Sequence, residues 1–142
     1  MATAEFVHLH GHSEYSLLDG GCHLDRMAAL AAERGMPALA LTDHGNLFGA
    51  VSHYNACADA GIKAIIGCEV YVSIGSRHVR KAARGLKHAS NHLVLLVENQ
   101  TGYKNLIKLV SKGYLEGYYA GVGAYLTGDN LAWTGSDYWE ER

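Results

Sequence analysis

The feature that most constrains the fold is an alternation of apolar, strand-like runs with amphipathic helical patterns. Four runs have strand character, at residues 5–9, 38–42, 64–72 and 92–97. Three helical patterns, with apolar residues at intervals of three and four, occur after the first, second and fourth of these runs. They lie at residues 24–34, 46–60 and 101–112. Because alternating strands and helices form βαβ units, the sequence predicts an α/β fold with a parallel sheet. Functional residues should then gather at the carboxyl ends of the strands.

The three helical patterns have recognisable starts and ends. Asn46 and Thr101 precede the second and third patterns, and both residue types cap helix N-termini. Gly35, Gly61 and Gly113 come at the ends, where the left-handed conformation costs glycine little. The spacing predicts one apolar face for each helix: Leu24, Met27, Leu30 and Ala31; Leu47, Val51, Tyr54 and Ala58; and Tyr103, Leu106, Ile107 and Val110.

Size and charge limit the class of protein. The 142 residues suffice for one domain with an ordinary core. The net charge of −2 provides no overall positive field to hold nucleic acid. No apolar run approaches the roughly 20 residues of a membrane span, and residues 1–15 do not resemble a secretory signal. Cys22, Cys57 and Cys68 form no CxxC pair, as expected of a chain in the reducing cytoplasm.

Histidines are concentrated in the first third of the chain, where five of the nine come before residue 45. His8, His10 and His12 alternate with other residues, so on a strand their imidazoles project from one face, about 6.6 Å apart. Two such rings can bind one cation or two adjacent cations. Taken alone, the pattern is also compatible with surface histidines.

Further candidate ligands follow the other strands. Asp19 lies in a turn after the first strand, Asp43 and His44 directly follow the second, and Glu69 lies near the end of the third. Mixed imidazole and carboxylate ligands are typical of zinc, manganese or iron sites rather than calcium sites. There are more ligands than one tetrahedral ion needs, which indicates two or three cations. Such clusters catalyse the hydrolysis of phosphate esters.

Other polar residues have two interpretations each. A basic segment carries five of the 12 Lys and Arg residues and no acid, and it is either a solvated loop or a contact for phosphate or nucleic acid: Arg77, Arg80, Lys81, Arg84 and Lys87. The three cysteines could ligate a metal, but small buried apolar roles are more common for unpaired cysteines. His23 and His53 lie in helical patterns, and we expect both to be partly exposed.

Three stretches carry a resemblance to a known family. They are HLHGHSEYSLLDG at residues 8–20, GMPALALTDHGNLFGA at 35–50 and GIKAIIGCEVY at 61–71. They closely resemble the polymerase-and-histidinol-phosphatase (PHP) domain at the N-terminus of bacterial DNA polymerase III alpha subunits. The strand at 92–97 and the residues at 102–106 continue the resemblance, which covers about residues 5–117.

The resemblance implies a trinuclear metal centre in a distorted (β/α)7 barrel. The positions that match the family's ligands are His10, His12, Asp19, His44, Glu69 and His92. It implies that Glu69 bridges two ions, and that up to three ions of Zn²⁺, or of Mn²⁺ or Mg²⁺, are bound in the complete domain. Glu69 and Asp43 are the candidate catalytic residues. His92 is a candidate by resemblance alone, because it begins its strand rather than ending it.

The chain departs from the family pattern towards its end. The family's remaining ligands should follow the fourth strand, but no Asp-x-His pair occurs after Tyr118. About four of seven strands are present, because a barrel of this type needs at least about 200 residues. We therefore expect a partial PHP domain at residues 1–117 and an irregular tail at 118–142. This pattern suggests a truncated or frame-shifted piece of a polymerase.

The resemblance implies two classes of function. As the start of a DNA polymerase III alpha subunit, the parent protein would replicate DNA, and the domain itself would be a metal-dependent phosphoesterase. Alternatively, the domain is a scaffold that docks the proofreading exonuclease subunit. A free-standing phosphatase that resembles histidinol phosphatase is a third hypothesis. The expected partners are the rest of the polymerase chain, the exonuclease and DNA, with no membrane.

Overall fold

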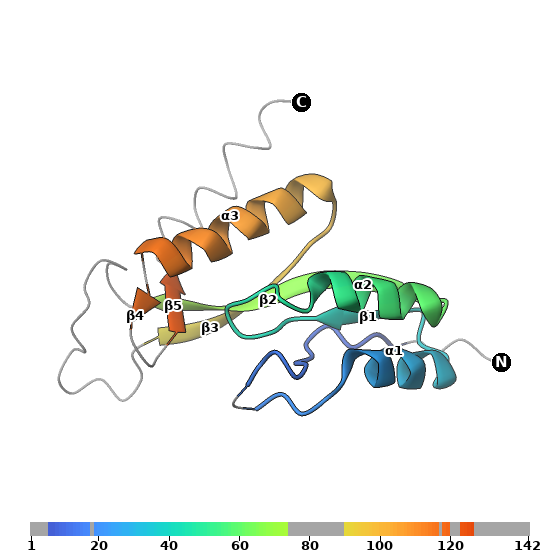
Figure 1. Cartoon of the computed structure of the whole chain (residues 1–142). Coiled ribbons are helices and arrows are strands. Elements are labelled where there is room, and N and C mark those ends of the chain that lie inside the picture. Colours follow the sequence, from blue (N-terminus) through green and yellow to red (C-terminus); the bar gives the residue numbers. More distant parts are fainter. Residues whose placement is uncertain (1–5, 18, 74–89, 117, 120–122, 127–142) are drawn as a thin grey trace.

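The computed structural model describes residues 6–17, 19–73, 90–116, 118–119 and 123–126. These residues form three helices and five strands (Figure 1). In chain order the elements are α1 (Leu24–Glu33), β1 (Ala38–Leu41), α2 (Ala50–Asp59), β2 (Lys63–Ser73), β3 (Ser90–Leu96), α3 (Gln100–Glu116), β4 (Tyr118–Tyr119) and β5 (Gly123–Leu126). The α/β fold expected from the alternating patterns is confirmed.

The long strand β2 organises the sheet. Its first half pairs with β1 in parallel, from Ala38 opposite Lys63 to Leu41 opposite Ile66. Its second half pairs with β3 on one side and, in parallel, with β5 on the other. Strand β3 is antiparallel to β2, whereas the sequence pattern predicted parallel strands. An antiparallel pair needs no crossover, so the chain can return along β2 directly after the segment that joins the two strands.

The N-terminal segment runs alongside β1 without forming a full strand. The backbone N–H of Ala40 donates to the carbonyl of His8 at 2.9 Å, and that of Thr42 donates to Gly11 at 2.8 Å. His8 forms an isolated parallel bridge with Leu39. The strand predicted at residues 5–9 is therefore reduced to one bridge, but the segment is still held in register with β1.

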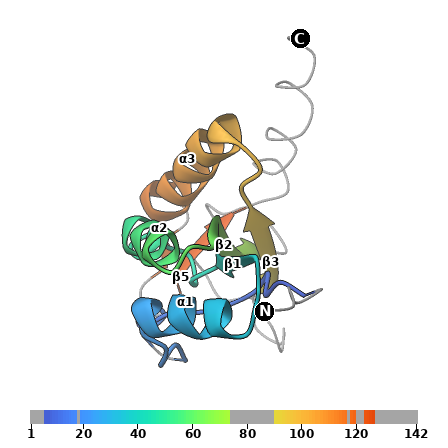
Figure 2. The same ribbon diagram turned by 90° about the vertical axis from the view of Figure 1, so that its right-hand side faces the viewer.

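Two groups of buried side chains hold the helices to the sheet. Helices α1 and α2 pack together beside β1 through Ala28, Ala31, Leu39 and Cys57 (Figures 1 and 2). Helix α3 packs on the second half of β2, where the buried residues are Cys68, Val70, Leu106 and Leu109. The first group includes Leu39 of β1 and the second includes Cys68 and Val70 of β2, so together they hold the two strands that carry part of the candidate site.

The helix ends differ in detail from those predicted. Helix α1 is followed by Gly35 in the left-handed conformation (φ 74°), as the sequence indicates. Asn46 does not cap α2, which begins at Ala50. Its side chain instead accepts a hydrogen bond from the backbone of Phe48 and closes a turn before the helix. For α3 the capping side chain is Asn99, which accepts from the backbone N–H of Gly102.

The buried face of α2 is not the predicted apolar one. Its buried residues are Ala50, His53 and Cys57, whereas Val51 and Tyr54 are mostly exposed. The expectation that His53 is partly exposed is thus wrong. The ring is fully buried because its Nε2–H can donate to the carbonyl of Leu39 at 3.1 Å, which satisfies the polar group against β1. Burial also raises the pKa of the Cys57 thiol.

Residues 118 onward are not wholly irregular, in contrast to the prediction. Among the described residues, β4 pairs antiparallel with β5, and β5 pairs with β2 at Tyr71 and Val72. The short strand β5 therefore belongs to the same sheet as β2 and pairs with the last part of that strand. None of the helices in the described part of the chain combines the length and the apolar character needed to cross a bilayer.

The buried His53 predicts a loss of stability in mild acid. Desolvation by burial lowers its pKa in the folded protein from the ordinary value of 6.5. Below that pH the unfolded chain binds a proton that the folded chain does not, so the free energy of unfolding falls as pH falls. Between about pH 7.5 and about pH 5.5 we expect His53→Gln to remove about 1 kcal/mol of this pH dependence.

Chemical denaturation of both proteins at the two pH values measures the effect. The matched control is His23→Gln, because His23 is exposed just before α1. A wild-type pH dependence that His53→Gln leaves unchanged would contradict the prediction.

Candidate metal centre

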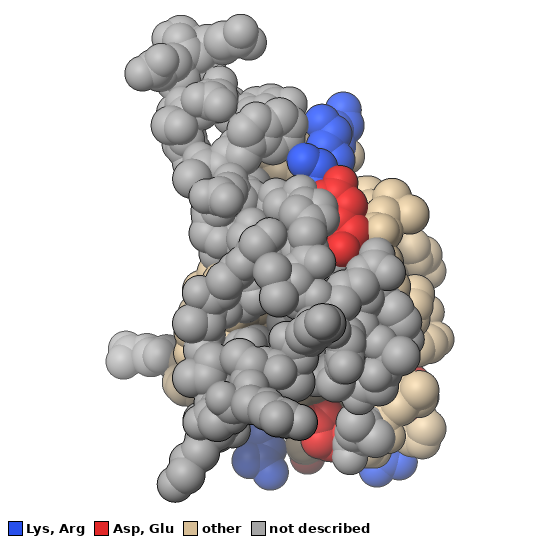
Figure 3. All heavy atoms as spheres, turned by 90° about the vertical axis from the view of Figure 1, so that its left-hand side faces the viewer, with Lys and Arg blue, Asp and Glu red and all other residues tan. Residues whose placement is uncertain are grey.

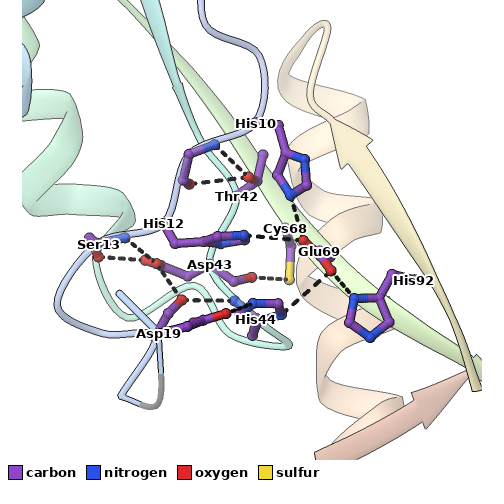
Figure 4. A network of polar contacts seen from close by, with 12 residues as sticks. His10, His12, Ser13, Asp19, Thr42, Asp43, His44, Cys68, Glu69 and His92 are labelled. Atoms are coloured by element: carbon purple, nitrogen blue, oxygen red, sulfur yellow. Dashed lines mark hydrogen bonds and ion pairs between the residues drawn. The ribbon is translucent and has the colours of Figure 1, made fainter. Parts of the chain in front are cut away.

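The carboxylate of Glu69 lies at the centre of the candidate site (Figure 4). It is 3% exposed and is surrounded by four imidazoles, those of His10, His12, His44 and His92. His10 Nε2 lies 2.5 Å from Oε2, and His12 Nε2 lies 3.3 Å from the same oxygen. His44 Nδ1 lies 3.6 Å from Oε1, with which His92 Nδ1 is hydrogen-bonded.

The pairing of the N-terminal segment with β1 brings His10 and His12 to this carboxylate. Besides the backbone bond from Thr42, Gly11 between them makes two bonds to the Thr42 side chain: its N–H donates to Oγ1 at 3.0 Å, and its carbonyl accepts from the hydroxyl at 3.1 Å. Because neighbouring residues of an extended segment point to opposite faces, the two histidines project to the same side. Their rings meet edge to face with centroids 4.9 Å apart.

His44 reaches the same place from the end of β1. The backbone N–H of Glu69 donates to Asp43, and the N–H of Gly45 donates to Glu69, at 3.1 Å and 2.8 Å. His44 and Glu69 thereby form a parallel bridge beyond the end of β1. Gly45 has φ of 62°, a conformation that glycine adopts readily as the chain turns away.

His92 enters from β3, and the antiparallel pairing explains why. His92 lies opposite Tyr71, and Glu69 is two residues before Tyr71 on β2. Diagonal neighbours on one face of an antiparallel pair are close enough for long side chains to touch. A residue at the start of β3 therefore meets the far half of β2. Sequence reasoning could not place His92 because it assumed that all the strands were parallel.

The imidazoles keep Glu69 ionised despite its burial. Desolvation alone would raise the pKa of this carboxyl group. The hydrogen bond from His10, the positive potential of His44 and the hydrogen bond from His92 outweigh it, so the pKa lies below its ordinary value. The buried group is thus an anion at neutral pH, as a ligand for a cation must be.

A second carboxylate contacts His44 from the other side. Asp19 Oδ2 lies 2.9 Å from Nε2 of His44, at the exposed rim of the site. The ring of His44 also stacks on that of His12, with centroids 4.2 Å apart and planes 16° apart. The structure therefore brings together all six residues that match the family's ligand positions.

Asp43 lies apart from this cluster and faces the loop that carries Asp19. Its buried carboxylate accepts hydrogen bonds from the N–H and hydroxyl of Ser13 and from the hydroxyl of Ser16, at 2.7, 2.8 and 2.7 Å. The structure thus places Asp43 where it holds a loop. The adjacent thiol of Cys68 donates to the Asp43 carbonyl, and burial raises the pKa of that thiol to about 12.

In the described part of the chain, two groups of ligand atoms are compact enough to hold a metal ion, and they share Glu69. One consists of His10, His12 and Glu69, and the other of His44, Glu69 and His92, with the ligand atoms of each within 4.8 Å of one another. The ring of His12 also has a buried Nδ1 without a hydrogen-bond partner among the described residues. A buried carboxylate shared by four imidazoles is a donor set that fits divalent cations.

Some residues that the sequence predicted for the site lie outside the described part of the chain, and some residues of the site were not predicted. The basic residues Arg77, Arg80, Lys81, Arg84 and Lys87 lie outside the described residues. On the face shown in Figure 3, the described acidic and basic side chains form small separate groups. Ser13, Ser16 and Tyr71 contact the site residues but were not predicted from the sequence. Tyr71 could have been predicted, because it is two residues after Glu69 and its side chain therefore lies on the same face of β2.

Comparison with known sequences extends the structural evidence. A sequence profile of the PHP domain matches residues 8–139. The chain is 52% identical to the DNA polymerase III subunit alpha of Treponema pallidum over 119 residues, which is 84% of this chain and 10% of that protein. It is 49% identical to the same subunit of Thermus aquaticus, over 81% of this chain and 10% of that protein. The chain thus spans about a tenth of the length of these relatives.

Two solved structures have a similar fold. An amidohydrolase from Chromobacterium violaceum, solved with sulfate and without metal, matches at a TM-score of 0.50 and 28% identity, over 75% of this chain and 34% of its own. A protein from Bifidobacterium adolescentis, assigned as a metal-dependent phosphoesterase, matches at a TM-score of 0.50 and 15% identity, over 80% of this chain and 36% of its own. The described elements therefore correspond to part of a larger fold.

Proposed function

The chain belongs to the PHP domain family, and from this premise we propose that it is the N-terminal PHP domain of a bacterial DNA polymerase III alpha subunit and hydrolyses phosphoesters with bound divalent cations. The relatives at about half identity support the parent protein. The sharing of the Glu69 carboxylate by two cation-competent groups carries the proposal for the domain's own chemistry.

The residues present favour particular cations. Imidazole nitrogens outnumber carboxylate oxygens in both groups, a composition that suits Zn²⁺ or Mn²⁺ better than Mg²⁺ or Ca²⁺. His10 and His12 would hold one cation and His44 and His92 a second, and the Glu69 carboxylate belongs to both groups. His44 and Asp19 supply a further pair of donors. Divalent cations supply positive charge that stabilises the oxygens of a phosphoryl group in transfer and makes water a stronger acid.

The chain's own residues make the site rigid and selective for anionic oxygen. Four imidazoles, which bind a cation as neutral ligands, share one buried carboxylate, so among the described contacts only Glu69 and Asp19 would offset the positive charge of a bound cation. The rim is open, because the side chains of His10 and His92 are about half exposed. A phosphate group can therefore reach the cluster from solvent, while Glu69 remains beneath it.

The larger partners follow from the parent protein. The matched part of this chain covers only 10% of the relative from Treponema pallidum, so the rest of a polymerase chain and DNA are the proposed partners. The basic residues at 77–87 are the proposed contact for phosphate or nucleic acid. A proofreading exonuclease subunit is the proposed protein partner, and the cytoplasm is the proposed compartment.

Metal binding is the direct test of the proposal. The 142-residue chain, treated with chelator and reloaded with Zn²⁺ or Mn²⁺, should retain at least one ion per chain by elemental analysis. Zn²⁺ at about 100 times its dissociation constant should stabilise the fold by about 2.7 kcal/mol in denaturation experiments. His10→Ala should weaken both effects, whereas the exposed His23→Ala should not. Retention of no ion by the wild-type chain would refute the proposal.

Hydrolysis separates catalysis from a scaffold role. Bis(p-nitrophenyl) phosphate is a generic phosphodiester whose cleavage is followed by absorbance. Metal-dependent cleavage that His10→Ala removes would support the phosphoesterase. Stoichiometric metal binding with no cleavage by this chain or by a longer polymerase polypeptide would favour the scaffold that docks a partner.

A further inference from the structure

Tyr71 touches two of the histidines of the candidate metal centre. Its hydroxyl oxygen lies 3.1 Å from Nδ1 of His44. Its ring is nearly parallel to that of His44, with centroids 5.9 Å apart and planes 14° apart. It also meets the ring of His92 edge to face, with centroids 4.7 Å apart. Tyr71 therefore packs against both of these histidines, on the same face of β2 as Glu69.

Both ring nitrogens of His44 have a polar partner, and the two partners differ in chemistry. Nε2 lies 2.9 Å from the Asp19 carboxylate, which only accepts hydrogen bonds. Nδ1 faces the Tyr71 hydroxyl, which can donate or accept. The oxygen of Glu69 is farther from Nδ1, at 3.6 Å. The phenol is thus the nearer partner of Nδ1.

This difference matters because a neutral imidazole carries only one ring proton. In the tautomer that carries the proton on Nε2, this N–H can donate to Asp19, and the Tyr71 hydroxyl can donate to the lone pair of Nδ1. For Nε2 to offer its lone pair to a cation, the proton must lie on Nδ1, where it can donate to the Tyr71 oxygen. A hydroxyl group serves both states without moving. A carboxylate or an ammonium group at this position would serve only one.

We propose that Tyr71 is a positioning residue for cation binding: its hydroxyl holds the His44 ring so that Nε2 faces the same point as the Asp19 carboxylate in either tautomer. This inference rests on the proposed function, because it concerns a cation at the same site. The residues that hold metal-ligating histidines through the second ring nitrogen commonly change metal affinity by about 10- to 100-fold when removed. Tyr71 has the place and the chemistry of such a partner.

The substitution Tyr71→Phe tests the inference, because it removes the hydroxyl and leaves a ring to pack against His44 and His92. Nitrogen-15 NMR of the chelator-treated chain reports on the tautomer of His44 without any metal. Competition with a chromogenic chelator reports Zn²⁺ affinity. We expect the His44 ring signals to shift and the affinity to fall about 10- to 100-fold. The matched control is Tyr54→Phe, since Tyr54 is an exposed tyrosine on α2.

A double substitution distinguishes positioning from a general structural role. If Tyr71 acts through His44, Tyr71→Phe should cost no further affinity in a His44→Gln background. An equal loss in both backgrounds would overturn the inference, as would unchanged His44 signals and unchanged affinity in the single variant. If the wild-type chain bound no Zn²⁺, the proposed function would fail. The His44 signals alone would then decide whether the hydroxyl holds the ring.

Discussion

Replacing Glu69 with glutamine should abolish cation binding at both groups of ligands at once. The substitution keeps the shape of the side chain and removes the negative charge. Glu69 is the one carboxylate common to both groups, and it is buried, so no solvent ligand replaces it easily. Loss of a residue that only hydrogen-bonds to a metal ligand lowers metal affinity by about 10- to 100-fold. We therefore expect the loss of this shared ligand to lower the affinity by more than about 100-fold. Zn²⁺ titration of the chelator-treated chain measures it.

The same variant should show no metal-dependent cleavage of a phosphodiester. Glu33→Gln is the matched control. Glu33 is exposed at the end of α1, and its substitution removes the same charge from the chain. Circular dichroism would show whether the fold is retained. Zn²⁺ affinity within about threefold of wild type in a folded Glu69→Gln chain would contradict the central role of this carboxylate. The groups would then hold cations through imidazoles alone.

The sequence predicted much of the site because two simple rules apply to it. The alternation of His10 and His12 predicted that both project from one face, and their rings do meet. The rule that parallel strands present their carboxyl ends together predicted that His44 and Glu69 come close, and they form a bridge. Both rules depend on backbone geometry alone, so they hold before any side chain is placed.

The same rules failed where a strand changes direction or a helix turns its polar face inward. His92 came from the resemblance, because its contact with Glu69 depends on β3 being antiparallel. His53 was expected to be partly exposed. The pattern of apolar residues cannot show that the carbonyl of Leu39 on β1 lies where it can accept a hydrogen bond from the His53 ring. Each failure concerns a hydrogen-bond partner or a strand direction that is set by distant residues.

Asp43 shows a third limit, because a residue type can suit two roles. The pair Asp43-His44 at a strand end predicted a catalytic carboxylate. In the structure His44 faces the cluster and Asp43 faces away from it, toward Ser13 and Ser16 (Figure 4). Ser16 in turn accepts from the N–H of His44 and, through its carbonyl, from the N–H of Asp19. We therefore propose that Asp43 holds the loop rather than reacting.

The substitution Asp43→Ala should destabilise the fold by about 3–5 kcal/mol. It leaves the hydroxyls of Ser13 and Ser16 and one backbone N–H buried without an acceptor, and each such group costs about 1–3 kcal/mol. Asp43→Asn should cost less, because one amide oxygen still accepts. The free energy of unfolding from urea titrations measures both, with Asp59→Ala as the control at an exposed carboxylate at the end of α2.

The two roles for Asp43 predict different combinations of results. If it holds the loop, Asp43→Asn should lower stability and also weaken Zn²⁺ binding, because Ser16 links the Asp43 carboxylate to the backbone of Asp19. If it reacts directly, the variant should keep the stability and affinity of the wild type and lose only phosphodiester cleavage. Its burial at 1% exposure and its three hydrogen bonds favour the first combination, since a reacting carboxylate would have to give up bonds that hold Ser13 and Ser16.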